Sequence, residues 1–224
     1  MHVTLRSRLV PLRSQHLFPT VRLALARASR REPARFRLLH FSVQRDHLHL
    51  IVEAADERAL SSGVRSVAIR VARYVNELLG RRGTLWADRW HGRALKTPRE
   101  VRNALVYVLA NFRKHSRRTP HSGIDPFSSG AWFDGWREWA PSSGRAPPWA
   151  ASAAFRRDWK ALPVSPSRPA LGSEHRGLRR HHHAQRAPQQ DEPIACVVST
   201  PRGWLARIGW RRRGLIALNE GPRG

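Results

Sequence analysis

The chain of 224 residues is long enough for one domain with a tail or for two small domains, and its formal net charge is +25, from 41 lysines and arginines against 16 acidic residues. Such a charge favours a polyanionic partner, which can be a nucleic acid, an anionic membrane surface or a ribosomal component. The single cysteine, Cys196, excludes an internal disulfide and a cysteine-based zinc cluster, and the lack of a long apolar run or signal-peptide pattern predicts a reduced, soluble, cytoplasmic protein without a membrane span.

The N-terminal part of the chain predicts a strand, a helix and a second strand. Residues 2–8 alternate between apolar and polar side chains, as a half-buried strand does. Residues 19–32 are rich in Leu, Ala and Arg and stop at Pro33, which indicates a helix. Residues 35–43 predict the second strand. Its apolar side chains on one face would be Leu39, Phe41 and Val43.

A third strand is predicted from Asp46 to Val52, where two histidines flank one leucine. Because successive side chains of a strand point to opposite faces, His47 and His49 share one face. The other face would bury Leu48, Leu50 and Val52. The short connection at residues 44–46 favours an antiparallel hairpin with the preceding strand. Two imidazoles at this spacing can bind one divalent cation, but a complete site needs another ligand from elsewhere in the chain.

Residues 56–79 predict a long helix, with Asp56 as its N-cap and Gly80 directly after its end. Its apolar positions keep helical spacing, namely Leu60, Val64, Val67, Val71, Val75 and Leu78. Gly63 lowers the helix propensity of the first half. Residues 84–96 then predict a loop and a fourth strand.

A further helix is predicted to start at Thr97. Thr97 and Glu100 form a capping box, and Pro98 occupies the first helical position. The buried stripe would consist of Val101, Leu105, Val108 and Phe112. Tyr107 and Asn111 lie one turn apart on a different side. This helix therefore presents a phenol and a carboxamide together, away from its core face.

The order of these elements implies an α+β fold, a ferredoxin-like antiparallel sheet with helices packed on one face. The leucines and the valine of the third strand would point toward those helices, so His47 and His49 would face the opposite side. The helix that carries Tyr107 would have to pack across that side, either from the same chain or from a partner subunit.

After about Trp139 the composition changes to Pro, Ser, Ala, Gly and Arg, which predicts a disordered basic linker over residues 138–198. The run His181–His183 lies in this linker, where adventitious metal affinity is a better reading than a specific site. Residues 199–224 regain pattern, with tryptophans and arginines interleaved. This short segment either docks on the domain or stacks on nucleic-acid bases. Residues 1–137 form the main domain.

The histidine strand and the Tyr-x-x-x-Asn helix together resemble the single-tyrosine HUH transposases of bacterial insertion sequences and their REP-associated relatives. Further matching pieces occur in the family's order, namely His2–Arg6, Asn76–Trp90 and Ile124–Trp136. The resemblance covers roughly residues 1 to 137. By position it implies that His47 and His49 are metal ligands, that Tyr107 is the nucleophile, and that Asn111 is a further polar ligand.

The resemblance implies a transposase that cleaves and rejoins single-stranded or hairpin DNA through a 5′-phosphotyrosine intermediate. A phenol with an ordinary pKa of about 10 is a poor nucleophile at neutral pH, so a cation on the phosphate is needed. Mg²⁺ or Mn²⁺ would be held by His47, His49 and Asn111. The only other tyrosine, Tyr74, neighbours the apolar stripe of the long helix, where a packing role fits better. Because bond energy is conserved, no nucleotide-binding loop is required, and none is found.

Arg6, Arg89, Trp90 and Arg93 are the candidates to hold the DNA backbone or an unpaired base, and a solvated basic loop is the alternative. Pairing of two chains would supply two tyrosines for the two ends of an excised segment, so we expect a homodimer associated with the nucleoid. Two other functions remain open, a non-catalytic nucleic-acid-binding protein and an HUH nickase of the replication or relaxase type.

Overall fold

The computed structural model describes residues 1–8, 10–115, 123–139 and 197–222. Most of the predicted linker lies outside the described residues, including the histidine run His181–His183. No helix in the described part of the chain has the length and apolar character needed to cross a membrane.

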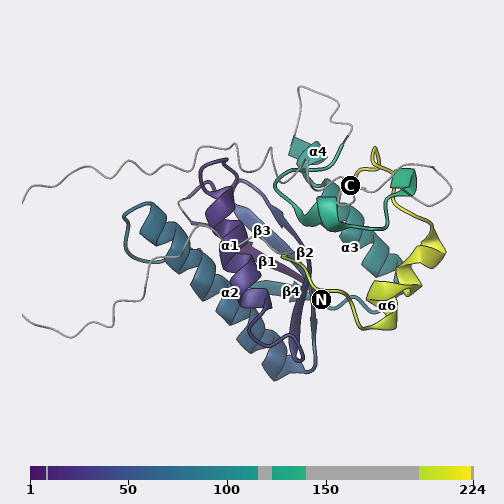
Figure 1. The fold of residues 1–224 in the computed structure, drawn as a ribbon, viewed down its shortest axis with the longest axis horizontal. Helices are drawn as coiled ribbons and strands as arrows, with labels where there is room; N and C mark the ends of the chain where they lie inside the picture. Colours follow the sequence, from purple (N-terminus) through teal and green to yellow (C-terminus); the bar gives the residue numbers. More distant parts are fainter. Residues whose placement is uncertain (9, 116–122, 140–196, 223–224) are drawn as a thin grey trace, which may run out of the picture.

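Four antiparallel strands form one sheet in the order β2-β3-β1-β4 (Figure 1). They are β1 (His2–Arg6), β2 (Phe36–Val43), β3 (His47–Ala54) and β4 (His91–Arg93). β2 and β3 form the predicted hairpin, in which the Gln44 N–H donates to the carbonyl of His47 over 2.7 Å. β1 lies beside β3 and pairs Thr4 with His49 and Arg6 with His47. The α+β fold class predicted from the sequence is confirmed.

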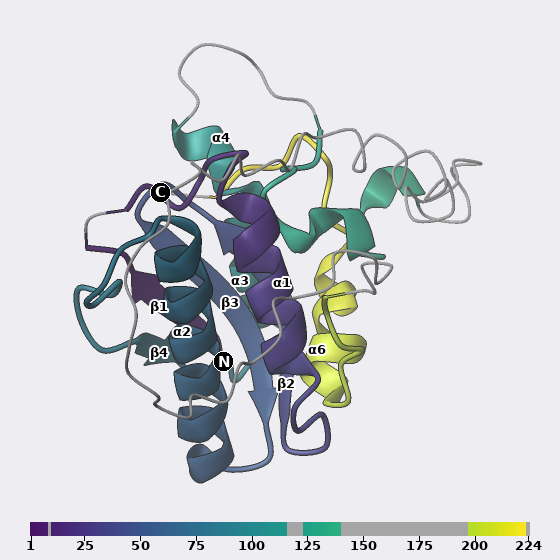
Figure 2. The ribbon, with the colours of Figure 1, turned by 60° about the vertical axis from the view of Figure 1, so that its left-hand side comes forward.

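Two helices cover one face of this sheet, α1 (Phe18–Ser29) and α2 (Glu57–Leu78) (Figure 2). Asp56 caps α2 as predicted, because its carboxylate accepts a hydrogen bond from the Ala59 N–H over 2.6 Å. Gly63 has a packing reason. A Cβ at this position would lie 2.1 Å from Cδ2 of Phe36, so the glycine that lowers helix propensity makes room for a buried ring.

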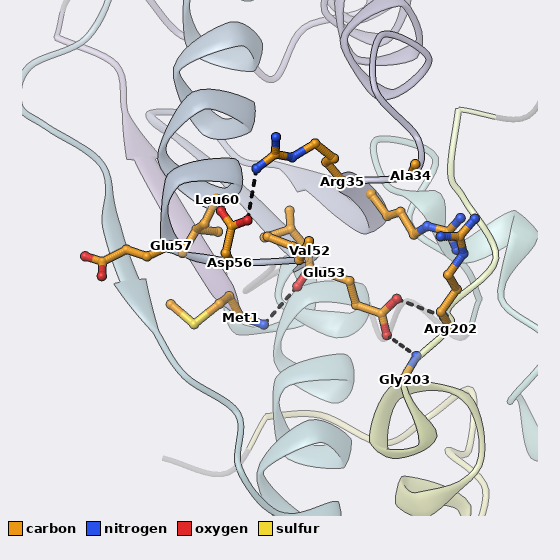
Figure 3. A pocket seen from close by; sticks show the side chains of 13 residues that line it. Met1, Ala34, Arg35, Val52, Glu53, Asp56, Glu57, Leu60, Arg202 and Gly203 are labelled. Atoms are coloured by element: carbon orange, nitrogen blue, oxygen red, sulfur yellow. Dashed lines mark hydrogen bonds and ion pairs between the residues drawn. The ribbon is translucent and has the colours of Figure 1, made fainter.

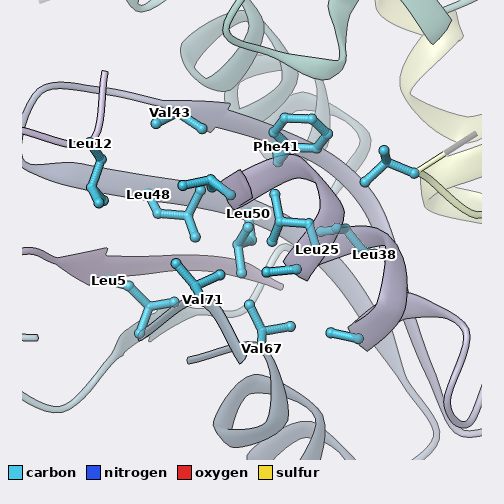
Figure 4. Packing of buried hydrophobic residues seen from close by; sticks show 14 of the residues in the cluster. Leu5, Leu12, Leu25, Leu38, Phe41, Val43, Leu48, Leu50, Val67 and Val71 are labelled. Atoms are coloured by element: carbon cyan, nitrogen blue, oxygen red, sulfur yellow. The ribbon is translucent and has the colours of Figure 1, made fainter. Parts of the chain in front are cut away.

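The main core lies between this helical layer and the sheet (Figure 4). From β3 it receives Leu48, Leu50 and Val52, all fully buried, which confirms the predicted alternation. From α2 it receives Val64, Val67, Val71 and Val75, also fully buried. Burial of each side chain contributes on the order of 2 kcal/mol relative to exposure, so this face supplies much of the driving force for folding.

Helix α3 (Pro98–Ala110) packs against the opposite face of the sheet. Its capping box forms as predicted, since the Thr97 hydroxyl accepts from the Glu100 N–H and the Glu100 carboxylate accepts from the Thr97 N–H. The helix ends at Ala110, two residues before the last residue of the predicted apolar pattern, and Phe112 begins the short helix α4 (Phe112–His115). The chain's own α3 therefore lies across the histidine side of the sheet.

One residue of β2 points to the other face than predicted. The pairing of β2 with β3 is shifted between Leu38 and His40, which makes Leu39 the extra residue of a β-bulge. Leu39 consequently joins the core beneath α3, whereas Phe41 and Val43 stay in the core beneath α1 and α2. Simple alternation failed here because a bulge reverses the facing of the residues on one side of it.

The C-terminal segment from Ser199 to Pro222 docks on α3 and contains α6 (Trp204–Arg207) and η4 (Gly209–Arg213) (Figure 1). The preceding described segment contains η1 (Ser129–Trp132) and η2 (Arg137–Trp139). The Trp210 ring is buried and stacks on Phe133 at 5.4 Å, and Arg102 forms a double ion pair with Glu220. Of the two roles open for this segment, docking is the one that the fold displays.

Glu53 fixes the beginning of this C-terminal segment (Figure 3). Its carboxylate accepts hydrogen bonds from the backbone N–H groups of Arg202, over 2.8 Å, and Gly203, over 2.9 Å. A cavity of about 480 Å³ lies beside this contact. Glu53 is six residues beyond His47 in the same strand, roughly 20 Å along it, and neither His47 nor His49 lines the cavity. The cavity and the histidines are therefore separate features of the molecule.

Candidate active site

His47 and His49 lie on the face of β3 that α3 partly covers. Their rings are stacked, with centroids 5.9 Å apart and planes inclined by 5°. His49 is 6% exposed, whereas His47 lies nearer to solvent at the start of the strand. The sequence placed both side chains on one face, and the pairing of β3 with β1 confirms that placement.

Each histidine has a polar neighbour at its Nδ1 atom. The Asp46 carboxylate lies 2.8 Å from Nδ1 of His47, and the Thr4 hydroxyl lies 3.2 Å from Nδ1 of His49. Metal-binding histidines commonly engage one ring nitrogen in this way, because the bond fixes the ring and its tautomer and directs the other nitrogen to the metal. Burial raises the pKa of Asp46, but the hydrogen bond and the charge of His47 outweigh it, so that pKa lies below its usual range.

Tyr107 reaches the same place from α3. Its ring stands almost perpendicular to that of His49, with centroids 5.2 Å apart and planes inclined by 80°. Tyr74 lies elsewhere, on the helical side of the sheet, where its hydroxyl accepts a hydrogen bond from Arg27 over 2.6 Å and its ring packs against the main core. The packing role predicted for Tyr74 is confirmed, and Tyr107 is the tyrosine that contacts a histidine.

Asn111 follows Tyr107 by one turn and is 3% exposed. Its Oδ1 atom is buried and has no hydrogen-bond partner among the described residues. A buried acceptor without a partner costs about 1–3 kcal/mol, and such atoms are rare in native proteins. An oxygen in this state is suited to a ligand that the chain itself does not supply.

His2 belongs to this cluster, although the sequence analysis gave it only as part of the matching piece His2–Arg6 and not as a site residue. Its ring centroid lies 5.4 Å from that of His49 and 5.6 Å from that of Tyr107. Burial, followed by the positive charges of the N-terminus and Arg93, lowers the pKa of His2 to about 4, so the ring is neutral at neutral pH. The alternation of His2 and Thr4 along the first strand was the available signal, because both residues share the face of His49 through the pairing of β1 with β3.

The side chains around His47 and His49 determine which ion the predicted metal site could hold. Among the described residues, no three or more His, Cys, Asp and Glu side chains are grouped so as to hold a metal ion. The chain thus offers two imidazoles and one buried amide oxygen, with no carboxylate ligand. This donor set fits a divalent cation whose remaining ligands come from a substrate, and the unpartnered Oδ1 of Asn111 is the observation in its favour.

The predicted DNA contacts are distributed around the cluster. Arg6 is exposed and lies opposite His47 in the strand pairing, and Arg93 is exposed and lies opposite His2. Arg89 is exposed in the loop before β4, whereas Trp90 is half-buried against the main core. The two strand arginines therefore flank the histidines directly.

No family model matches this chain, and no curated protein matches it. Among solved structures, that of the REP-associated tyrosine transposase bound to a REP hairpin is similar over 66% of this chain and 84% of that chain. The sequence identity is 21% and the TM-score is 0.46. A likeness at this level assigns no function, so any assignment rests on the geometry of the site.

Proposed function

We propose that this protein is a metal-dependent transposase that cleaves and rejoins single-stranded DNA through a 5′-phosphotyrosine intermediate. The observation that carries the proposal is the contact between Tyr107 and His49, with the buried, unpartnered Oδ1 of Asn111 one helical turn away. A phenol can act as the nucleophile, and two oriented imidazoles with an amide oxygen can hold the cation that this chemistry uses.

In this proposal His47, His49 and Asn111 would hold Mg²⁺ or Mn²⁺. The ion would supply charge neutralisation on the scissile phosphate. Asp46 and Thr4 keep the two imidazoles in orientation through the contacts at Nδ1.

Tyr107 supplies the nucleophile. Its hydroxyl oxygen bonds to phosphorus and gives up its proton, while the bond from phosphorus to the 3′ oxygen breaks and that oxygen takes a proton. The products are a 5′-phosphotyrosine and a free 3′-OH. Attack by a second DNA 3′-OH on the phosphotyrosine reverses these changes, restores the tyrosine and joins the strands without an external energy source.

The proposed partner is single-stranded or hairpin DNA in the cytoplasm, at the nucleoid. The net charge of +25 supplies affinity for phosphate, and Arg6 and Arg93 place part of that charge beside the histidines. An unpaired backbone is required because attack on phosphorus needs room around the scissile bond. Only one chain is needed to bring Tyr107 to His49, so a homodimer is a separate proposal that rests on the need to process two strand ends.

The test incubates the full-length protein with labelled single-stranded oligonucleotides and Mn²⁺ and looks for a covalent adduct on a denaturing gel. We expect an adduct with the wild-type protein, and none with Tyr107→Phe or after chelation of the metal. His16→Ala is the matched control, because His16 is exposed and lies outside the sheet. DNA binding without any adduct would support the non-catalytic alternative, and equal nicking of blunt duplex would contradict the proposed substrate.

A further inference from the structure

His2 occupies the corner between Tyr107 and His49. The ring contacts both residues, at centroid distances of 5.6 Å and 5.4 Å. Its Nε2 atom is buried and has no hydrogen-bond partner within the described part of the chain. Two atoms without partners thus belong to residues near Tyr107, this nitrogen of a ring in contact with it and Oδ1 of Asn111 one helical turn after it.

Packing alone does not account for a histidine at this position. A phenylalanine ring would fill the same corner without leaving a buried nitrogen unsatisfied, which costs about 1–3 kcal/mol. Coordination of the metal does not account for it either. Although His2 lies near His49, the described residues do not form a cluster of three histidines with metal-binding geometry.

The surroundings of His2 favour an anion. Arg93 lies opposite His2 in the pairing of β1 with β4 and is exposed, so a guanidinium borders the same corner, where one of its nitrogens also forms an ion pair with Glu100 over 3.2 Å. The imidazole can donate a hydrogen bond from a ring nitrogen that carries a proton, and the buried Nε2 is the nitrogen without a partner. Phosphate oxygens are commonly contacted by arginines and by polar side chains that donate hydrogen bonds.

We propose that His2 is a phosphate-binding residue, whose Nε2–H donates a hydrogen bond to a non-bridging oxygen of the phosphate that Tyr107 attacks. The identity of this phosphate rests on the proposed function. The contact would hold phosphorus near the Tyr107 hydroxyl. The phosphate would then be bound between His2 and the cation.

The direct test does not require catalysis. Full-length protein labelled with ¹⁵N-histidine is titrated with inorganic phosphate in the presence of Mg²⁺, and the ring nitrogen signals are followed by NMR. Comparison with His2→Phe identifies the His2 signals. We expect a saturable shift of the His2 Nε2 signal and none for the exposed His16; an unchanged His2 signal would overturn the proposal.

Two substitutions separate the nitrogen from the ring. His2→Phe keeps the ring and loses both nitrogens, whereas His2→Gln keeps an N–H donor and loses the ring. We expect kcat/KM for adduct formation to fall about tenfold in His2→Phe and to recover partly in His2→Gln, with Mn²⁺ affinity unchanged in both. A His2→Phe protein as active as wild type would overturn the role of His2 and leave the proposed function intact. If wild type forms no adduct while phosphate still shifts His2, the proposed function fails and the phosphate contact stands.

Discussion

The two faces of the sheet are built from alternate residues of the same strands, yet they differ in the chemistry of the side chains that they bury. Beneath α1 and α2, Leu48 and Leu50 are fully buried among hydrocarbon side chains. On the other face, His47 and His49 are joined by His2, and α3 brings Tyr107 and Asn111. Two of the buried polar atoms without partners among the described residues, Nε2 of His2 and Oδ1 of Asn111, lie at this second face beside Tyr107 and the histidines, and the others belong to Ser66 and Asn76 of α2 and to Arg81.

The difference shows which face stabilises the fold and which face carries the proposed chemistry. A core of apolar side chains needs nothing from outside the chain. A buried amide oxygen and a buried imidazole nitrogen without partners lower stability, and such groups are retained where a ligand satisfies them. Substitution of one residue of β3 should therefore lower mainly stability, whereas substitution of its neighbour should lower mainly adduct formation.

The largest contrast is expected between His49→Ala and Leu50→Ala. Leu50→Ala should lower the free energy of unfolding by about 2–5 kcal/mol, because it opens a cavity in the core. His49→Ala should change stability far less but reduce adduct formation on the order of 100-fold or more, because it removes a metal ligand. Urea denaturation and the adduct assay on both variants check this. Equal loss of stability in the two variants would remove the distinction between the faces.

Asn111→Ala should separate stability from activity at a single residue. Adduct formation should fall roughly 10-fold to 100-fold because a ligand is lost. The melting temperature should stay unchanged or rise, because an unpartnered buried oxygen is removed. Differential scanning calorimetry without metal provides the measurement. A large loss of stability without metal would indicate that Asn111 serves the fold and not a ligand.

A buried histidine on the face of the sheet that α3 covers should also make the free energy of unfolding depend on pH. Burial lowers the pKa of His40 to about 4, and its Nδ1 lies 3.2 Å from the Ser129 hydroxyl. Because the unfolded histidine takes up a proton near pH 6.5 and the folded one only near pH 4, stability is full above pH 6.5 and falls as the pH drops toward 4. We expect His40 to contribute a loss on the order of 1–2 kcal/mol from pH 7 to pH 5, and His2, whose pKa is also lowered to about 4, to add a loss of the same sign.

Urea denaturation of wild type and His40→Gln at both pH values tests this dependence. The substitution should flatten the change with pH, even if it lowers stability at pH 7. An equal pH dependence in the two proteins would show that other groups cause it.

The smallest effect is expected when two inactive variants are mixed, because neither should restore the activity of the other. Because the chain brings Tyr107 to its own His49, a mixture of Tyr107→Phe with the His47→Ala, His49→Ala protein should form no more adduct than either alone. The denaturing-gel assay at equal concentrations checks this. Restored adduct formation would mean that tyrosine and histidines come from different subunits of a dimer.

Much of the fold followed from local patterns. The hairpin, the Asp56 cap, the capping box at Thr97 and the facing of Leu50 were predicted because each depends on residues close in sequence. Leu39 was placed on the wrong face because a bulge depends on the partner strand. Docking of Trp210 on Phe133 depends on a long-range contact that no local pattern contains.

In the site, too, local sequence patterns identified residues but not the long-range contacts between them. The motif identified two pairs of residues that are close in sequence, His47 with His49 and Tyr107 with Asn111. Contact between the two pairs required α3 to cross the sheet, which alternation alone could not decide. His2 and Thr4 were visible as an alternating pair, but their approach to His49 depended on which strand lies beside β3.

The central claim is that Tyr107 forms the covalent bond to DNA, and the chain contains only one other tyrosine, Tyr74. The most direct measurement isolates the protein–DNA adduct, digests the DNA with nuclease and the protein with protease, and locates the remaining nucleotide by tandem mass spectrometry. We predict a 5′-phosphate ester on Tyr107 and an unmodified Tyr74. A nucleotide on Tyr74 or on a residue outside the site, or the absence of any adduct from active protein, would contradict the account.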